Sequence, residues 1–289
     1  MAREAPGARD ERERMAGIDL LKAINKVSDV VHNRPRPLRE FDQIYMKTGD
    51  LVTQSDVVAG WAHGKRLAFI GDGDAVSVCV AYLRDPDILA FGPSKVTVFD
   101  FDERIVNAVK RFAEKERIDG VLDAVWYNVL DPFPEPGKYD CFYTNPPWGE
   151  HNGGDSVNVF AQRGFEATGY RGEGLLVIAD DDDLPWAQEV LANAQRFAAE
   201  RGFRVSQLQP KRHRYHLDVE ILSCNLFLRA VPGNSAPPEP TGPIAPDRLE
   251  NFYGLYQPPR VGRVRELGRP DYGKANDAEY ELEYLEERP

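Results

Sequence analysis

The fold is decided by the stretch Leu67-Ala68-Phe69-Ile70-Gly71-Asp72-Gly73-Asp74-Ala75. Its apolar half predicts a buried strand, and its glycines predict a tight turn, because glycine adopts backbone conformations that other residues avoid. A helical pattern follows over residues 75–84. The unpaired N–H groups at the start of a helix favour a ligand close to the turn. Val76 stands where the dinucleotide fingerprint has its third glycine, and Asp74 could simply cap the helix.

Strand-like and helix-like segments alternate through the middle of the chain. The predicted strands cover residues 67–70, 96–99, 124–127, 141–144, 175–179, 204–208 and 223–228, and the predicted helices cover residues 75–84, 103–117, 156–168 and 185–201. This alternation is typical of a parallel sheet with helices on both faces. The last two strands have no helix between them, which predicts a terminal antiparallel hairpin. The expected fold is α/β, with a mostly parallel seven-stranded sheet that resembles the class I methyltransferase-like Rossmann fold.

Both ends of the chain differ in composition from its middle. Residues 1–33 are predicted to form a polar tail and a short amphipathic helix, whose apolar residues at helical spacing are Ile18, Leu21, Ile24, Val27 and Val31. Residues 34–231 are expected to form a Rossmann-like domain that carries the motifs discussed below. Residues 232–289 begin with a linker rich in Pro, Gly and Ser and continue as a charged C-terminal tail, which is expected to be solvated.

The composition is acidic, with a net charge of −11 over 289 residues. This argues against a nucleic-acid partner, because phosphate binding depends on clustered Lys and Arg. The three cysteines, Cys79, Cys141 and Cys224, lack metal-ligand spacing and are interpreted as reduced core residues. The sequence shows no signal peptide and no apolar run of about 20 residues, so we expect a cytoplasmic protein without a membrane contact. The histidines form no metal-binding motif, so no metal is expected, and a homodimer stays open.

Polar side chains follow the second and third predicted strands. Asp100 and Asp102 stand at the end of the second strand. An acidic side chain there can accept hydrogen bonds from both ribose hydroxyls of a nucleoside, a role we assign to Asp100, while Asp102 is expected to cap the next helix. After the third strand, Asn128 or Asp131 could bind the amino group of an adenine, and the residues alone do not choose between them. Either could also be ordinary loop polarity.

The fourth predicted strand ends in Tyr143-Thr144-Asn145-Pro146-Pro147-Trp148. The two prolines restrict the backbone as it leaves the strand and hold the preceding side chain at the mouth of the sheet. Asn145 can then accept a hydrogen bond from a nitrogen, and Trp148 can stack on a flat or cationic group. We therefore predict a substrate-binding role for Pro146, Pro147 and Trp148.

Two families share motifs with this sequence. The motif Asn145-Pro146-Pro147-Trp148 resembles that of amino-methyltransferases acting on adenine, cytosine or glutamine nitrogens. A longer resemblance, over roughly residues 33–230, is to the branched-chain polyamine synthases, that is, the N4-bis(aminopropyl)spermidine synthases. It rests on Arg34-Pro35-Arg36-Pro37-Leu38-Arg39-Glu40-Phe41-Asp42-Gln43-Ile44-Tyr45, whose EFDQ is most distinctive, then on the GDGD turn, the FDFDE strand end and the Pro-Pro loop.

The resemblance to the polyamine synthases includes three differences. The family has GDDD at the glycine turn, where this sequence has Gly73 in place of the second Asp. The family also has an Asp at the position of Asn145, and a Glu or Tyr at the position of Trp148. These differences concern the two motifs that are expected to meet the reactants.

This resemblance implies that residues 34–231 are a catalytic domain that transfers an aminopropyl group from decarboxylated S-adenosylmethionine to a polyamine such as spermidine. It implies that Asp72 is the general base or orients the amine, helped by Asn145. A donor without a carboxylate presents only an ammonium to the turn, which acidic side chains would attract. The implied donor-binding residues are Gln43, Tyr45, Gly71, Gly73, Asp74, Asp100, Asn128 and Asp131.

Several alternatives stay open. Asp180 and Asp181, after the fifth strand, could line a channel for polyamine cations or belong to a solvated loop. The enzyme could instead be an S-adenosylmethionine-dependent N-methyltransferase, in which Asn145 and Trp148 hold an amino or amide nitrogen. The basic run at residues 211–214 is more typical of a solvated hairpin than of a nucleic-acid contact. A non-enzymatic relative that binds a nucleoside or a protein partner is the third hypothesis.

Overall fold

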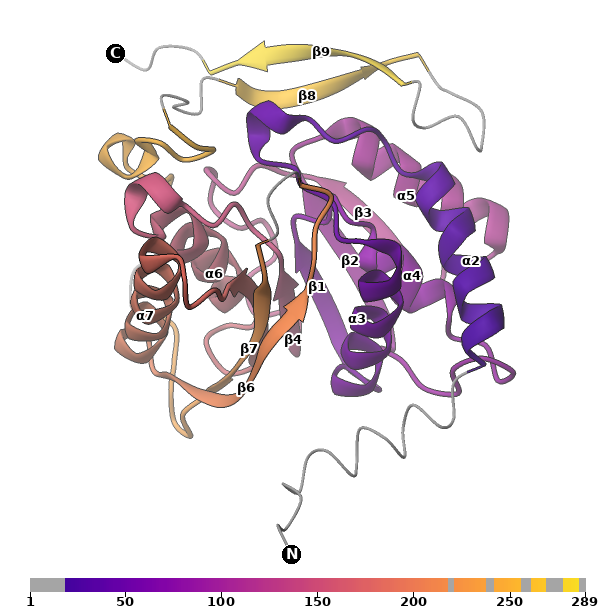
Figure 1. The fold of residues 1–289 in the computed structure, drawn as a ribbon, viewed down its shortest axis with the longest axis horizontal. Helices are drawn as coiled ribbons and strands as arrows, with labels where there is room; N and C mark the ends of the chain where they lie inside the picture. The colour runs from indigo at the N-terminus through magenta and orange to yellow at the C-terminus, as the bar shows by residue number, and fades with distance from the viewer. Residues whose placement is uncertain (1–18, 218–220, 238–241, 256–260, 269–277, 286–289) are drawn as a thin grey trace, which may run out of the picture.

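The computed structural model describes residues 19–217, 221–237, 242–255, 261–268 and 278–285. A seven-stranded sheet lies at its centre, with helices on both sides (Figure 1). The strand order is β3-β2-β1-β4-β5-β7-β6. The predicted polar tail at the N-terminus lies outside the described residues. Within them, no helix is both long and apolar enough to cross a membrane.

The central sheet contains every predicted strand. Strands β1 to β5 pair in parallel, whereas β7 runs antiparallel to both β5 and β6. The predicted α/β fold with a mostly parallel seven-stranded sheet and a terminal hairpin is therefore confirmed. The strands are β1 (Arg66–Ile70), β2 (Lys95–Asp100), β3 (Leu122–Trp126), β4 (Cys141–Thr144), β5 (Glu173–Ala179), β6 (Phe203–His213) and β7 (Ser223–Ala230).

Two groups of helices cover the two faces of the sheet (Figure 1). Alternate residues of β1 face the two layers, as the period of a strand requires. Leu67 and Phe69 pack in the core beneath the first group of helices, and Ala68 and Ile70 pack beneath the second. The first group is α2 (Leu20–Asn33), α3 (Thr48–Trp61), α4 (Val76–Tyr82) and α5 (Glu103–Glu116), and the second is α6 (Asp155–Ala167) and α7 (Pro185–Glu200).

Helix α2 confirms the predicted N-terminal helix, but only part of the predicted apolar face is buried: Val27 is, Leu21 and Ile24 are not, and Ile18 lies outside the described residues. Leu21 and Ile24 are 72% and 40% exposed. The buried side chains are Ala23, Val27 and Val30. The helix packs against α3 and α4 through this narrower face, so the larger apolar side chains on its other side stay outside the core.

The sequence analysis missed α3. Its buried residues include Asp50, Gln54 and Ser55 as well as apolar side chains. A helix that is buried on most sides and carries polar residues inside shows no clear apolar stripe, so its period is hard to detect. The three cysteines are free and buried, as predicted.

The prediction of a solvated C-terminal tail is wrong for residues 242–255 and 261–268, which bury side chains against the domain, whereas residues 232–237 are mostly exposed. A second sheet, β8 (Val261–Leu267) with β9 (Glu279–Tyr284), lies outside the central sheet (Figure 1). Val264 is fully buried and forms a parallel bridge with Asp102 at the end of β2. The carboxylate of Glu266 accepts hydrogen bonds from both terminal nitrogens of Arg111 on α5, at 2.9 and 3.0 Å. Charged side chains of this segment thus form ion pairs with side chains of the central domain.

Candidate active site

A cavity of about 260 Å³ lies at the carboxyl ends of β1, β2 and β4. Open α/β sheets bind ligands at this edge, where the strand order reverses, and here the reversal lies between β1 and β4. The cavity gathers most of the predicted site residues from segments far apart in the sequence. Those in its lining are Gln43, Tyr45, Gly71, Asp72, Gly73, Asp74, Asp100, Asn145, Pro146, Pro147 and Trp148.

The glycine turn after β1 presents Asp72 to the start of α4. Gly71 has a φ of 73°, in the left-handed region that favours glycine. The carboxylate of Asp72 accepts hydrogen bonds from the backbone N–H groups of Val76 at 3.0 Å and Ser77 at 2.9 Å. Asp72 therefore binds the exposed N–H groups of α4, and the prediction that Asp74 caps this helix is wrong. Burial raises the pKa of Asp72 well above its ordinary value.

Asp74 instead joins two other segments of the site. One carboxylate oxygen accepts the backbone N–H of Met46 at 2.6 Å, and the other accepts the side-chain amide of Asn145 at 2.7 Å. Arg34 donates to the main-chain oxygen of Asp74 at 3.0 Å. Burial raises the pKa of Asp74, while the Met46 N–H and the Arg34 charge act in the opposite direction. The structure thus brings a predicted donor-binding residue and a predicted catalytic residue into direct contact.

Asp100 lies at the end of β2, where the sequence predicted an acid for ribose binding. Its two oxygens accept the backbone N–H groups of Asp72 at 3.0 Å and Asp102 at 2.9 Å. Burial, together with the negative charge of Asp102, raises the pKa of Asp100 to about 7. Asp102 caps α5, as predicted, by accepting the backbone N–H of Arg104 at 3.0 Å. The ribose-binding role of Asp100 stays a prediction.

The segment before α3 forms one wall of the cavity. Gln43 donates to Asp102 at 3.3 Å, which ties this wall to the end of β2. The hydroxyl of Tyr45 donates to the carbonyl of Pro35 at 2.8 Å, and the guanidinium of Arg34 lies 4.2 Å from the ring centre. These contacts hold both predicted donor-binding side chains in place at the cavity.

Gly73 faces the ring of Tyr45. A Cβ added at Gly73 would lie 3.3 Å from Tyr45 Cε1, which is closer than an ordinary van der Waals contact. Tyr45 has little freedom to move away, because its hydroxyl and its ring face are both occupied. The aromatic ring therefore takes the space beside the position where the resembling family has an Asp.

Asp42 is a cavity residue that the sequence analysis did not assign to the site. It follows the short helix η1 (Arg39–Phe41) with a φ of 55°, so its backbone is left-handed. Burial raises the pKa of Asp42 to about 6, against the opposing effects of the Arg39 charge and the Trp148 backbone N–H. The nearby charge of Glu150 raises this pKa further. Its place in the distinctive EFDQ motif was the signal that could have identified it.

Two aromatic side chains, Trp148 and Tyr215, also line the cavity, and Tyr215 forms a bridge with Met46 beside the segment before α3. The indole N–H of Trp148 donates to the carbonyl of Val177 at 3.3 Å, which orients the ring. Trp148 meets Tyr215 edge to face, with 5.1 Å between ring centres. Tyr215 is buried, and its hydroxyl forms a hydrogen bond with Ser223 at 2.8 Å. No motif in the sequence indicated Tyr215.

Asn128 and Asp131 do not line the cavity, although the adjacent Tyr127 and Val129 do. The Asn128 amide donates to the carbonyl of Gly262 in β8, and its oxygen accepts the backbone N–H of Leu130 at 2.9 Å. The C-terminal hairpin therefore binds the side chain of Asn128, one of the two residues considered for the adenine contact. The geometry offers no support for that role.

The acidic run after β5 also lies outside the cavity lining. Asp180 accepts the backbone N–H of Lys211 at 3.0 Å, and Asp181 accepts that of Asp183 at 3.0 Å. The ammonium of Lys211 forms an ion pair with Asp182. The acidic run therefore connects the end of β5 with β6. Its position gives no support to an anionic channel for the substrate.

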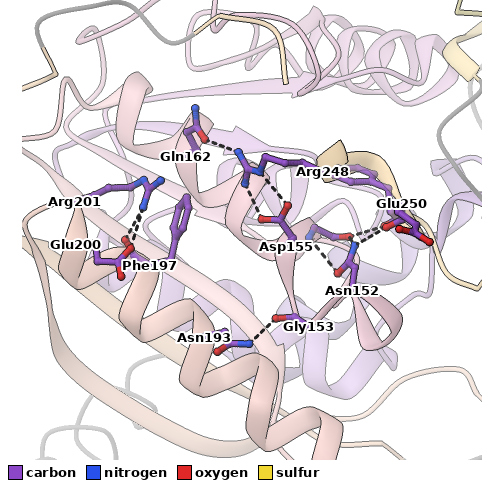
Figure 2. Close-up of polar contacts among 12 residues, drawn as sticks. Asn152, Gly153, Asp155, Gln162, Asn193, Phe197, Glu200, Arg201, Arg248 and Glu250 are labelled. Atoms are coloured by element: carbon purple, nitrogen blue, oxygen red, sulfur yellow. Dashed lines mark hydrogen bonds and ion pairs between the residues drawn. The ribbon is translucent and has the colours of Figure 1, made fainter. Parts of the chain in front are cut away.

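Residues 242–255 pack against α6 through polar contacts (Figure 2). Arg248 forms a bidentate ion pair with Asp155, at 2.9 and 2.7 Å, and also donates to Gln162 at 3.2 Å. Gly254, a few residues further on, lines the cavity. The part of the chain that the sequence assigned to a linker and tail thus contributes directly to the site.

Residues 22–256 match the family model of the branched-chain polyamine synthase A C-terminal domain. An uncharacterized protein of Methanocaldococcus jannaschii is 26% identical over 216 residues, which are 73% of this chain and 50% of that protein. The N(4)-bis(aminopropyl)spermidine synthase of the same organism is 26% identical over 148 residues, which are 50% of this chain and 39% of that protein. The chain thus spans half or less of the length of these curated relatives.

Solved structures show the same fold. The branched-chain polyamine synthase from Thermus thermophilus, in complex with N4-aminopropylspermidine and 5'-methylthioadenosine, matches with a TM-score of 0.64 and 21% identity, over 77% of this chain and 67% of that chain. A candidate RNA methyltransferase from Pyrococcus horikoshii matches with a TM-score of 0.51 and 16% identity, over 73% and 99%. These likenesses confirm the predicted class I methyltransferase-like fold. Because the family model covers most of the sequence, the chain belongs to the branched-chain polyamine synthase family.

Proposed function

We propose that this chain is an aminopropyltransferase, which moves the aminopropyl group of decarboxylated S-adenosylmethionine to an amine of a polyamine such as spermidine. The charge of the cavity carries this proposal. Its described lining includes no Lys or Arg side chain. Acidic side chains without a Lys or Arg beside them favour cationic ligands, and both reactants are cations. The acidic residues of the lining are Asp42, Asp72, Asp74, Asp100 and Glu150.

The same charge favours the decarboxylated donor over S-adenosylmethionine. The carboxylate of S-adenosylmethionine would approach the glycine turn, where Asp74 lies in the lining. Two like charges about 4 Å apart repel each other by about 4 kcal/mol at an effective dielectric constant of about 20. The decarboxylated donor avoids this repulsion and keeps its ammonium and sulfonium charges.

The proposed reaction forms one C–N bond and breaks one C–S bond. The lone pair of the amine attacks the carbon beside the sulfonium, 5'-methylthioadenosine leaves, and one proton passes from the nitrogen to a base. Holding the two reactants in line supplies much of the rate enhancement in such a transfer. The Thermus thermophilus relative, whose structure holds 5'-methylthioadenosine and N4-aminopropylspermidine, supports this choice of molecules.

The geometry suggests a division of roles among the carboxylates. Asp42 has a pKa of about 6, so it is ionised at neutral pH and accepts a proton more readily than an ordinary carboxylate. We assign to Asp42 the role of the base that accepts the proton from the attacking nitrogen. We assign the binding of the amine to Asp74 and Asn145. Asp72 was predicted to be the base; we assign to it instead the holding of the turn, through its hydrogen bonds to the start of α4.

A runner-up function is N-methyl transfer from S-adenosylmethionine, which the presence of Asn145 and Trp148 in one cavity favours. Calorimetry with the two donors separates the two functions. We expect decarboxylated S-adenosylmethionine to bind more tightly than S-adenosylmethionine. Tighter binding of S-adenosylmethionine would contradict aminopropyl transfer and support the methyltransferase.

A product assay tests the acceptor. Spermidine and decarboxylated S-adenosylmethionine are incubated with the protein, and mass spectrometry follows the polyamine. We expect the mass of spermidine to increase by one or two aminopropyl groups, together with release of 5'-methylthioadenosine. Release of 5'-methylthioadenosine with a different amine, and none with spermidine, would contradict spermidine as the acceptor.

A further inference from the structure

The hairpin formed by β8 and β9 follows the residues that match the family model, which end at residue 256 (Figure 1). None of the described residues of this hairpin lines the cavity. They contact instead the two loops that leave β2 and β3, and α5, the helix between these strands in the sequence. Any effect of the hairpin on the candidate active site must therefore pass through the residues that it contacts.

Val264 connects the hairpin to the loop after β2. Its backbone N–H donates to the carbonyl of Phe101 at 3.2 Å, and it forms a parallel bridge with Asp102. Phe101 lines the cavity. The backbone N–H of Asp102 in turn donates at 2.9 Å to the carboxylate of Asp100, which is the predicted ribose-binding residue. Because Val264 is fully buried, the contact that places this loop is shielded from water.

Gly262 connects the hairpin to the loop after β3. Its carbonyl accepts the side-chain amide of Asn128, which is buried. The Asn128 oxygen accepts the backbone N–H of Leu130 at 2.9 Å, so the same side chain also fixes the shape of its own loop. The residues on either side of Asn128 are Tyr127 and Val129, and both line the cavity. The hairpin therefore holds this loop at a point between two lining residues.

Glu266 anchors the hairpin on α5, away from the cavity. Its carboxylate binds both terminal nitrogens of Arg111 and also accepts the side-chain amide of Asn107 at 2.7 Å. Its backbone N–H donates to the carboxylate of Glu103 at 2.9 Å. The side chain of Glu266 is only 2% exposed. Removal of one partner from a buried ion pair is strongly destabilising, because the remaining charge stays unpaired. A change at Glu266 therefore weakens the docking of the hairpin without touching a lining residue.

We propose that the hairpin of β8 and β9 positions the loops after β2 and β3 so that they bind the nucleoside of the donor. The lining residues of these loops are Asp100, Phe101, Tyr127 and Val129. The identity of the ligand rests on the proposed function, whereas the contacts of the hairpin do not. Loops that are held in place before the ligand arrives bind it more tightly, because binding no longer carries the cost of ordering them.

Glu266→Ala tests the positioning of the loops. We expect calorimetry on the full chain to show that the Kd for 5'-methylthioadenosine rises about tenfold, the factor that follows when about one molecule in ten keeps the hairpin docked. The KM for spermidine at a saturating donor concentration should stay unchanged, since Asp74 and Asn145 lie in the loops after β1 and β4. An unchanged Kd, or equal changes for donor and acceptor, would overturn the inference.

Two further variants make this comparison specific. Glu266→Gln keeps an oxygen that accepts a hydrogen bond from Arg111 but loses the charge, so the Kd should rise less, by about threefold. This variant also replaces Glu266→Ala if the latter does not fold. Glu281→Ala is the matched control, because the ion pair of Glu281 with Arg265 at 3.9 Å lies within the hairpin. Its Kd should equal that of the unchanged protein, and a rise as large as in Glu266→Ala would show that docking is not the cause.

Hydrogen exchange in the unchanged protein tests the inference in the opposite direction. If the docked hairpin favours the nucleoside, the nucleoside favours the docked hairpin by the same factor. Addition of 5'-methylthioadenosine should therefore slow the exchange of the β8 amides, that of Val264 among them, although β8 does not line the cavity. The amides of residues 203–209 on β6, which also lie outside the lining, should exchange at the same rate as before. No slowing in β8, or equal slowing in both strands, would contradict the positioning role.

The outcomes separate this inference from the proposed function. A protein that binds 5'-methylthioadenosine but transfers nothing to spermidine refutes the proposed function, while the Kd values and the exchange of β8 still decide whether the hairpin positions the loops. A protein that turns over spermidine with the same Kd in all three variants keeps the proposed function and refutes the positioning role. A protein that does not bind the nucleoside refutes both.

Discussion

The side-chain amide of Asn145 donates to a carboxylate oxygen of Asp74 at 2.7 Å, and so joins the end of β4 to the glycine turn after β1. The other oxygen of Asp74 accepts the backbone N–H of Met46 at 2.6 Å. One buried carboxylate therefore connects three segments that surround the cavity. Changes at Asp74 and at its neighbours separate the roles proposed for the acidic residues.

Asp74→Ala should lower kcat/KM for spermidine about 100-fold. It removes charge-assisted hydrogen bonds to the amine, whose loss costs about 3 kcal/mol. The bond from Arg34 survives, because it is made to the main-chain oxygen of Asp74. Steady-state kinetics and thermal unfolding of the same preparation check this result. A folded variant with unchanged kcat/KM would exclude Asp74 from amine binding.

Asp72→Ala should lower the free energy of unfolding by about 2 kcal/mol, because two N–H groups at the start of α4 lose their partner. Urea denaturation measures this change. Asp72→Asn keeps one acceptor and should cost less stability, while retaining turnover. Complete loss of turnover in Asp72→Asn at unchanged stability would instead support the original hypothesis that Asp72 is the base.

The pH dependence of kcat/KM should report on Asp42. Its pKa is raised to about 6, so the carboxylate that accepts the proton is present above pH 6 and is lost as the pH falls through that value. Activity should therefore rise with pH through about 6, and Asp42→Asn should lack this step. In Glu150→Gln the step should move to lower pH, because the Glu150 charge raises the pKa of Asp42. An unshifted step in Glu150→Gln would contradict the assignment.

Arg248→Ala should lower the free energy of unfolding by about 1 kcal/mol. The variant loses the bidentate ion pair with Asp155, which is partly exposed and therefore worth less than a buried pair (Figure 2). Arg248→Lys keeps the positive charge but loses the planar group that binds both carboxylate oxygens, so it should retain only part of this stability. Arg265→Ala, in a more exposed ion pair on β8, serves as the control and should change little.

Regular patterns explain why so much of the fold was predictable. Strand β1 has four consecutive apolar residues before the glycine turn, and α5 carries a clear apolar stripe behind an Asp cap. Helix α3 shows neither signal, since Gln54 and Ser55 are buried inside the protein. Gln54 has its partners, Asn225 and His213, on β7 and β6, which only the folded chain brings to it.

The site was predicted less completely than the fold, because a sequence motif identifies candidate residues but not the distant groups to which they form hydrogen bonds. The acids of the glycine turn were expected in the site, and both line the cavity. Their roles depend on contacts with distant segments: Asp72 binds α4, whereas Asp74 binds Met46 and Asn145. Asn128 shows the same dependence, since the C-terminal hairpin binds its side chain.

By itself, the sequence determined the order of strands and helices, the position of the glycine turn and the set of polar residues at the strand ends. These features are local, because the period of apolar residues and the conformations of Gly and Pro depend on neighbours in the chain. Only the tertiary structure decided that Asp42 and Tyr215 join the cavity and that the amide of Asn145 donates to Asp74. Burial and hydrogen-bond direction depend on segments far apart in the sequence, which meet only when the chain folds.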